Sequence, residues 1–268
     1  MDSGCWIVPD WPIPANIRAA VTTRLFPGNS TPPFDAFNLG ANTGENVGIV
    51  RANRMVLERA LALPAAPRWL SQTHGTGVAS FDAVVATEVP EADAAIARDS
   101  GIVLAVLTAD CLPLLLCADD ASEIAVVHAG WRGLSAGVIE ATIDKLTSPR
   151  SHVLAWLGPA IGRASYEVGD EVRSMFVRTD EGTDSASQPR KSGPATRGTK
   201  MNPAAAFDAT RPGHWHCDLE LLARQRLRAQ GVTRIYGGGF DTASDERLYS
   251  YRRDGRTGRF ASLIWRTR

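Results

Sequence analysis

The chain has 268 residues, of which 44% are hydrophobic and 22% are charged, the balance of an ordinary globular protein. Its 29 basic and 29 acidic side chains cancel, so no overall charge favours nucleic acid or an anionic membrane as a partner. The four scattered cysteines, a start without a basic and apolar leader, and the lack of any apolar run of ~20 residues predict a reducing, cytoplasmic setting.

The N-terminal part of the chain alternates strand, loop and helix patterns. Residues 16–24 have the alternation of a strand, and the Gly, Pro and Asn residues of 26–40 predict a loop long enough to suggest a function. Residues 47–63 carry apolar side chains on one helical face, and Pro64 ends that helix. Residues 68–82 have the pattern of a strand, a glycine turn and a second strand.

The rest of the chain contains the most apolar runs, without the regular rhythm of a doubly wound sheet. One polar stretch, residues 179–208, has few large apolar side chains and predicts a mobile surface insertion. The other predicted segments are buried strands at 101–108, 113–119 and 123–130, an amphipathic helix at 134–146, a strand at 152–160, helices at 165–177 and 217–231, and strands at 233–240, 247–255 and 259–265.

Chemically active side chains stand at the ends of these apolar runs. Asp110 and Cys111 separate two predicted strands, His128 ends the next strand, and His74 stands before a glycine turn. Two imidazoles and one thiolate are good zinc ligands, and three protein ligands leave an open position, as in catalytic sites. The three ligands are far apart in the sequence, so they could share a metal only if the fold brings them together.

The same residues allow two other interpretations. Cys111 could be a nucleophile with His128 as its base. A single cysteine or histidine in an apolar run can also be a buried structural residue. For anions, Arg132 lies between two glycines at the start of a predicted helix and could hold phosphate in a bidentate fork, and Arg24 is a second candidate. No P-loop or dinucleotide motif is present.

Several sequence blocks occur in an order that resembles one known family. They are SQTHGTGV, TADCLPLLL, VVHAGWRGL, WLGPAIGRASYEVGDEV, CDL and SYRRDGRTGRFASLIW. Together they resemble the YfiH-like family, also called the laccase-domain or polyphenol oxidase family, over nearly the whole chain except about 179–208. The resemblance implies an α/β fold: one layered sandwich domain with mixed β-sheets over residues 1–268, distantly similar to a cytotoxic deamidase toxin domain.

The resemblance also implies an activity and a site. Family members bind zinc through residues that match His74, Cys111 and His128, and act on purine nucleosides. The implied reactions are phosphorolysis of adenosine, inosine and methylthioadenosine, and deamination of adenosine, with a purine nucleoside and phosphate as partners and neither nucleic acid nor membrane. On this basis, Cys111, His128 and Asp110 are the expected catalytic residues, and the expected substrate-binding residues are Arg24, Asn38, Gln72 and Arg132.

Two departures and three alternatives accompany this expectation. Many members have two cysteines where this chain has Ala164 and Ser165, and a Cys-Thr pair where it has Asp241 and Thr242. These departures argue against a second, cysteine-rich metal site. The alternative functions are a metal-free Cys/His hydrolase that edits peptidoglycan precursors, a copper-dependent polyphenol oxidase, since a cysteine and two histidines can also hold copper, and a binding module without catalysis.

Overall fold

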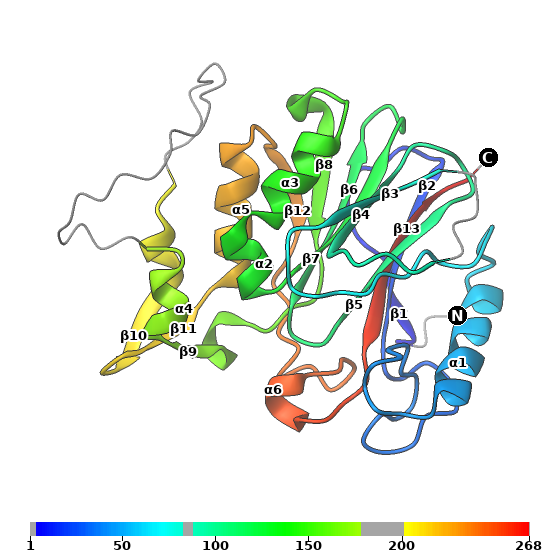
Figure 1. The fold of residues 1–268 in the computed structure, drawn as a ribbon, viewed down its shortest axis with the longest axis horizontal. Coiled ribbons are helices and arrows are strands. Elements are labelled where there is room, and N and C mark those ends of the chain that lie inside the picture. Colours follow the sequence, from blue (N-terminus) through cyan, green and yellow to red (C-terminus); the bar gives the residue numbers. More distant parts are fainter. Residues whose placement is uncertain (1–3, 83–87, 178–200, 268) are drawn as a thin grey trace.

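The computed structural model describes residues 4–82, 88–177 and 201–267. Within these ranges it confirms the predicted layered α/β sandwich with mixed sheets (Figure 1). Strands pair antiparallel except for β3 with β4 and β8 with β12, which run parallel. None of the helices in these ranges combines the length and apolarity needed to cross a membrane.

Three sheets form the framework. The four-stranded sheet has the order β1 (Trp6–Ile7), β2 (Ile17–Thr22), β13 (Phe260–Arg266) and β5 (Val103–Thr108). The six-stranded sheet has the order β12 (Arg234–Gly237), β8 (Val153–Leu157), β6 (Leu112–Ala118), β7 (Ile124–Ala129), β4 (Ala94–Ala97) and β3 (Val78–Phe81). The small third sheet contains β10 (Phe207–Arg211), β11 (His214–Cys217) and β9 (Glu167–Gly169).

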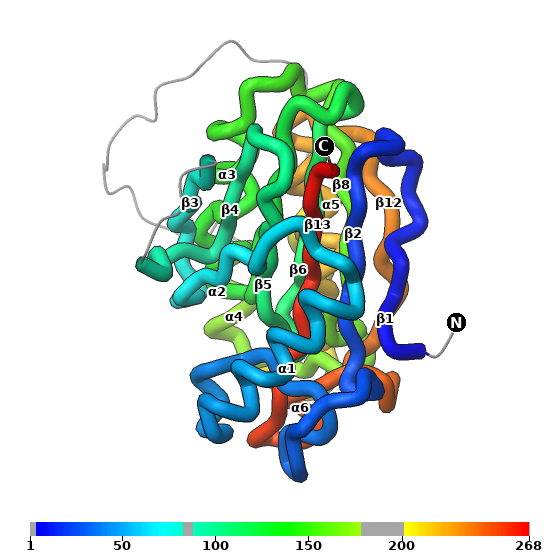
Figure 2. The backbone as a smooth tube through the Cα atoms, turned by 90° about the vertical axis from the view of Figure 1, so that its right-hand side faces the viewer, coloured from blue at the N-terminus to red at the C-terminus, as the bar shows by residue number. Residues whose placement is uncertain are grey.

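Helices cover the outer faces of the two larger sheets. The α-helices are α1 (Val47–Ala60), α2 (Trp131–Ala136), α3 (Val138–Lys145), α4 (Asp170–Ser174), α5 (Leu219–Ala229) and α6 (Tyr251–Asp254). Short 3-10 helices are η1 (Arg150–His152), η2 (Arg163–Ser165) and η3 (Pro203–Ala206). Figures 1 and 2 place α3 and α5 beside the six-stranded sheet and α1 beside the four-stranded one.

The continuous apolar runs follow from this layering, because both faces of the central strands are buried. Leu114 and Leu116 of β6 pack in the cluster that contains α3 and α5, whereas Leu115 packs in the cluster between the two large sheets. Successive strand residues point to opposite faces, so a strand buried on both sides has no polar positions. In β5, Leu104 faces the inter-sheet cluster, and Val103 faces the cluster that includes α1.

Two predicted elements are wrong. Residues 165–177, predicted as one helix, form part of η2, then β9 and α4, because β9 pairs with β11 and this pairing overrides the helical period. Residues 247–255, predicted as a strand, contain α6, whose start is capped by the Ser250 side chain accepting from the Arg253 backbone N–H.

Two other segments differ in part from their predictions. The helix predicted at 134–146 is divided into α2 and α3 at Gly137, whose φ of 102° is left-handed. Most of the insertion predicted at 179–208 lies outside the described residues. Its end is described from residue 201, and there residues 203–208 form η3 and the start of β10, with Ala206 and Phe207 buried.

Candidate metal centre and adjoining pocket

Three side chains far apart in the sequence meet at one end of the six-stranded sheet. One ligand atom from each of His74, Cys111 and His128 lies within 4.8 Å of the others. The two imidazole rings stand edge to face, with 4.8 Å between their centroids. Gly130 leaves room for them, since a Cβ atom there would lie 2.8 Å from Cys111 Sγ. The fold therefore brings together the trio that the sequence predicted.

The strand register places two members of the trio side by side. Pro113 of β6 pairs with His128 of β7, so Cys111, just before β6, lies beside the end of β7. The turn into β6 requires a left-handed residue, and Asp110 adopts a φ of 87° there. His74 is also left-handed, with a φ of 62°. Non-glycine residues pay a conformational cost in this region, which is typical of functional sites.

The carboxylate of Asp93 holds His128 in place, and the sequence interpretation overlooked Asp93. Asp93 is fully buried just before β4, and its Oδ1 lies 2.8 Å from Nδ1 of His128. The same carboxylate accepts the backbone N–H groups of Thr73, His74 and Gly75 at 3.1, 2.9 and 2.7 Å. One side chain therefore fixes the His128 ring and shapes the loop that presents His74.

Asp93, His128 and Cys111 form a row in which each group shifts the pKa of its neighbour. Burial alone would raise the pKa of Cys111, but the charge and hydrogen bond of His128, followed by those of His74, lower it to about 6. Burial would lower the pKa of His128, but Cys111 and Asp93 raise it to about 9. Burial would raise the pKa of Asp93, and its hydrogen bond with His128 helps to lower it to about 2. Both shifts favour a thiolate at Cys111 beside an imidazolium at His128.

The donor set fits a borderline-soft metal ion. One thiolate and two imidazoles suit zinc, and they are also acceptable to copper. Asp93 bonds Nδ1 of His128, so Nε2 of that ring is the atom left for a metal, and such a carboxylate partner is typical of ligating histidines. Among the described residues, no second group of three His, Cys, Asp or Glu side chains has this closeness. Ser165 and Asp241 stand where many members of the family have cysteines, and here Ser165 Oγ donates to Asp241 at 2.6 Å.

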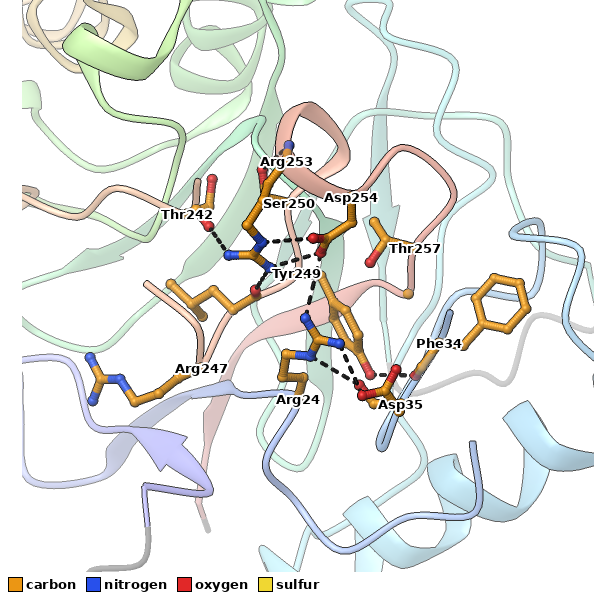
Figure 3. Close-up of polar contacts among 12 residues, drawn as sticks. Arg24, Phe34, Asp35, Thr242, Arg247, Tyr249, Ser250, Arg253, Asp254 and Thr257 are labelled. Carbon is orange, nitrogen blue, oxygen red and sulfur yellow. Dashed lines mark hydrogen bonds and ion pairs between the residues drawn. The ribbon is translucent and has the colours of Figure 1, made fainter. Parts of the chain in front are cut away.

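Arg24, predicted to bind phosphate, lies in a network of ion pairs. Its guanidinium pairs with Asp35 at 3.0 Å and with Asp254 at 3.5 Å, and it lies over the ring of Tyr249 (Figure 3). Asp254 also pairs with Arg253, so the two arginines share two carboxylates. Arg24 therefore fastens the loop of residues 26–40 to the C-terminal α6, and its contact with phosphate stays a prediction.

Asn38 and Gln72, predicted to contact the substrate, are likewise hydrogen-bonded within the protein. Asn38 is fully buried, and its Oδ1 accepts the backbone N–H groups of Gly40 and Arg259 at 2.9 and 2.8 Å. Gln72 pairs with both backbone groups of Leu107 at 2.8 Å. These amides serve as partners for backbone groups, in a loop for Asn38 and at the edge strand β5 for Gln72.

Asp110, predicted to take part in catalysis, is hydrogen-bonded within the protein. Its carboxylate accepts from Thr242 Oγ1 at 2.6 Å and from the Arg252 backbone N–H at 2.7 Å, whereas the partner of the His128 ring is Asp93. Asp110 thus connects the turn that carries Cys111 to the start of α6. Its role in catalysis stays a prediction.

An open pocket of about 460 Å³ adjoins the trio. Its lining includes Trp131, Arg132, Tyr166, Glu167, Arg211 and Arg252. Arg132, predicted to bind substrate, is exposed, with its guanidinium 4.3 Å from the centroid of the Trp131 ring. The pocket lies beside the trio, because Trp131 directly follows Gly130, which contacts Cys111.

Sequence comparison relates the chain to proteins of known family. Residues 18–267 match the family described as multi-copper polyphenol oxidoreductase laccase. A purine nucleoside phosphorylase of Pseudomonas aeruginosa is 45% identical over 97% of this chain and 98% of its own. The purine nucleoside phosphorylase YfiH of Escherichia coli is 42% identical over 97% of this chain and 98% of its own.

Solved structures support the same relationship. A crystal structure of a Neisseria meningitidis protein superposes with a TM-score of 0.86 at 36% identity, covering 98% of this chain and 100% of that one. YlmD from Geobacillus stearothermophilus superposes with a TM-score of 0.83 at 28% identity, covering 100% of this chain and 98% of that one.

The first prediction concerns the reactivity of the thiol. In metal-stripped protein, alkylation of Cys111 by iodoacetamide should be half-maximal near pH 6, because the neighbouring imidazolium lowers its pKa to about 6. Replacing His128 by Gln removes that charge and should move the midpoint upward, toward the ~8.5 of an ordinary thiol. Mass spectrometry of the Cys111 peptide against pH measures both. A wild-type midpoint near 8.5 would contradict the charge pair.

The second prediction concerns Asp93. Asp93→Asn keeps the size of the side chain but replaces one acceptor oxygen by a donor, so the His128 ring and the 73–75 loop lose partners. We expect zinc affinity, measured by competition with a chromophoric chelator, to fall about 10- to 100-fold. Asp144→Asn, which changes an exposed carboxylate, is the matched control and should bind zinc as the wild type does. Equal affinity in the two variants would show that Asp93 does not support the ligands.

Proposed function

Because the chain belongs to the YfiH family, described as multi-copper polyphenol oxidoreductase laccase, we propose that it is a zinc-dependent purine nucleoside enzyme. Its relatives named purine nucleoside phosphorylase support an enzyme of this type. The proposed reactions are phosphorolysis of adenosine, inosine and methylthioadenosine, and deamination of adenosine. The observation that carries the proposal is the convergence of His74, Cys111 and His128 beside a pocket that contains arginines.

The chemistry of phosphorolysis matches what the site offers. The bond between C1′ of the ribose and the purine nitrogen breaks, a phosphate oxygen forms a new bond to C1′, and the purine leaves with a proton. The negative charge of the attacking phosphate must be held beside C1′ while the sugar becomes electron-poor. Preorganised cations contribute strongly to such catalysis. Arg132, on the exposed rim of the pocket, is placed to hold that charge.

His74, Cys111 and His128 would hold the metal. Bound there, zinc would supply Lewis acidity, by polarising an oxygen atom and lowering the pKa of bound water, which suits deamination. The protein contributes the rest. Asp93 keeps the His128 ring in one orientation through Nδ1, and the left-handed turn at Asp110 aims Cys111 at the same point. The half-buried Tyr166 and Trp131 contribute aromatic rings to the lining of the pocket.

One observation favours a second candidate, a metal-free Cys/His hydrolase such as an editor of peptidoglycan precursors. His128 lowers the pKa of Cys111 and so favours its thiolate, and Asp93 orients that ring, which is the arrangement of a cysteine nucleophile with its base and orienting acid. A phenol oxidase would also need to store several electrons. A single three-ligand site in the described residues is a poor store for them, so copper oxidation ranks third.

The third prediction tests the proposed function directly. His74→Ala should remove the metal and lower nucleoside turnover by about 100-fold or more, because two ligands hold zinc poorly. His152→Ala, which changes an exposed histidine paired with Asp119, is the matched control and should keep both. Metal content and turnover of a nucleoside panel, with and without phosphate, are measured on the same samples.

The two candidate functions give different results in this experiment. Full nucleoside turnover by the metal-free His74→Ala protein would overturn the zinc proposal. Loss of activity on alkylation of Cys111 in a fully active, chelator-treated protein would favour the hydrolase. Metal-dependent turnover that requires phosphate would support phosphorolysis.

A further inference from the structure

Two arginines in the pocket lack acidic partners. The guanidinium of Arg132 lies over Trp131, and that of Arg252 lies 5.1 Å from the centroid of the Tyr166 ring. The only polar contact of the Arg252 guanidinium within the described chain is its donation to the Glu167 backbone oxygen at 2.9 Å. Neither guanidinium forms an ion pair with a carboxylate of the described residues.

The third arginine of the pocket is already neutralised. Arg211 binds the carboxylate of Glu167 at 2.8 Å, and Thr210 donates to the same carboxylate at 2.8 Å. Glu171 is the other acidic residue of the lining. The lining therefore carries three arginines against two glutamates, a net excess of one positive charge. This excess favours an anionic ligand, although the chain as a whole is neutral.

A short path connects Arg252 to the proposed metal centre. The Arg252 backbone N–H donates to Asp110 at 2.7 Å, and Asp110 directly precedes Cys111. On the other side, Trp131 follows Gly130, where a Cβ atom would lie 2.8 Å from Cys111 Sγ. The two arginines thus approach the trio from opposite segments of the chain, one from the start of α2 and one from α6.

A polar network holds α6 and so fixes Arg252. Figure 3 shows Arg253 between Asp254 and the Thr242 backbone oxygen, with Arg24 reaching Asp254 from below. Arg253 pairs with Asp254 at 2.7 Å and donates to the Thr242 oxygen at 3.0 Å, and Arg24 completes the network at 3.5 Å. A ligand-binding side chain on a fixed backbone loses less entropy on binding.

We propose that Arg132 and Arg252 form the subsite for the phosphate co-substrate, beside the metal trio. Each guanidinium can present two parallel N–H groups to a phosphate, the geometry in which arginine binds this anion most strongly. Arg252 takes the place that the sequence interpretation gave to Arg24, which forms ion pairs with Asp35 and Asp254. This assignment rests on the proposed phosphorolysis and names the residues that bind its second substrate.

The fourth prediction separates the two substrates kinetically. Arg252→Gln and Arg132→Gln should each raise the KM for phosphate about 10-fold or more, the effect of losing a charge-assisted hydrogen bond, and leave the KM for inosine within about 2-fold. Arg252→Lys keeps the charge but loses the fork, so its phosphate KM should lie between those of wild type and Arg252→Gln. Arg247→Gln removes an exposed arginine paired with Asp245, outside the pocket, and should match the wild type.

A direct binding measurement keeps the subsite and the proposed function distinguishable. Broadening of the 31P signal of inorganic phosphate should occur with wild-type protein and with Arg247→Gln, and be lost with Arg252→Gln. Active phosphorolysis with an unchanged phosphate KM in Arg252→Gln and Arg132→Gln would overturn the subsite alone. A wild-type protein that binds phosphate through these arginines but does not phosphorolyse nucleosides would support the subsite and overturn the proposed function.

Discussion

The buried carboxylate of Asp93 is the interaction on which the site depends. It receives the His128 ring from one strand and three consecutive backbone N–H groups from the loop of residues 73–75. A buried carboxylate is costly unless its oxygens are paired, and here every partner belongs to the site. Burial of the Asp93 carboxylate therefore favours one arrangement of the loop of residues 73–75 and one orientation of the His128 ring. The same arrangement faces both histidines toward Cys111.

Much of the fold and the metal trio could be predicted from the sequence, and the reasons are physical. Strands buried on both faces must be continuously apolar, so β5, β6 and β7 are recognisable, and the polar groups at their ends stand out. Asp93 has the same signal, an acid at the start of an apolar run, and could have been found in that way. The β9 segment was misassigned because its pairing with β11 arises only in the fold. The α6 segment was misassigned because a single side chain, the Ser250 cap, determines where that helix starts.

The substrate contacts expected of Arg24, Asn38 and Gln72 stay predictions, because residue type shows what a side chain can bind and not what it already binds. Arg24 forms ion pairs with two carboxylates, and Asn38 and Gln72 are hydrogen-bonded to backbone groups. These contacts join segments more than a hundred residues apart or link loops to strands. Arg132 and Arg252, which form no ion pair with the carboxylates of the described residues, could be identified only once the pairs of the other arginines were known.

The central claim is that one thiolate and two imidazoles share a single metal ion, and X-ray absorption at the zinc edge measures this most directly. The account predicts, in stoichiometrically loaded protein, one sulfur neighbour at about 2.3 Å and two nitrogen neighbours at ~2.0–2.1 Å, with the sulfur contribution absent in Cys111→Ser. A spectrum without sulfur in the wild type, or one unchanged by the replacement of Cys111, would contradict it.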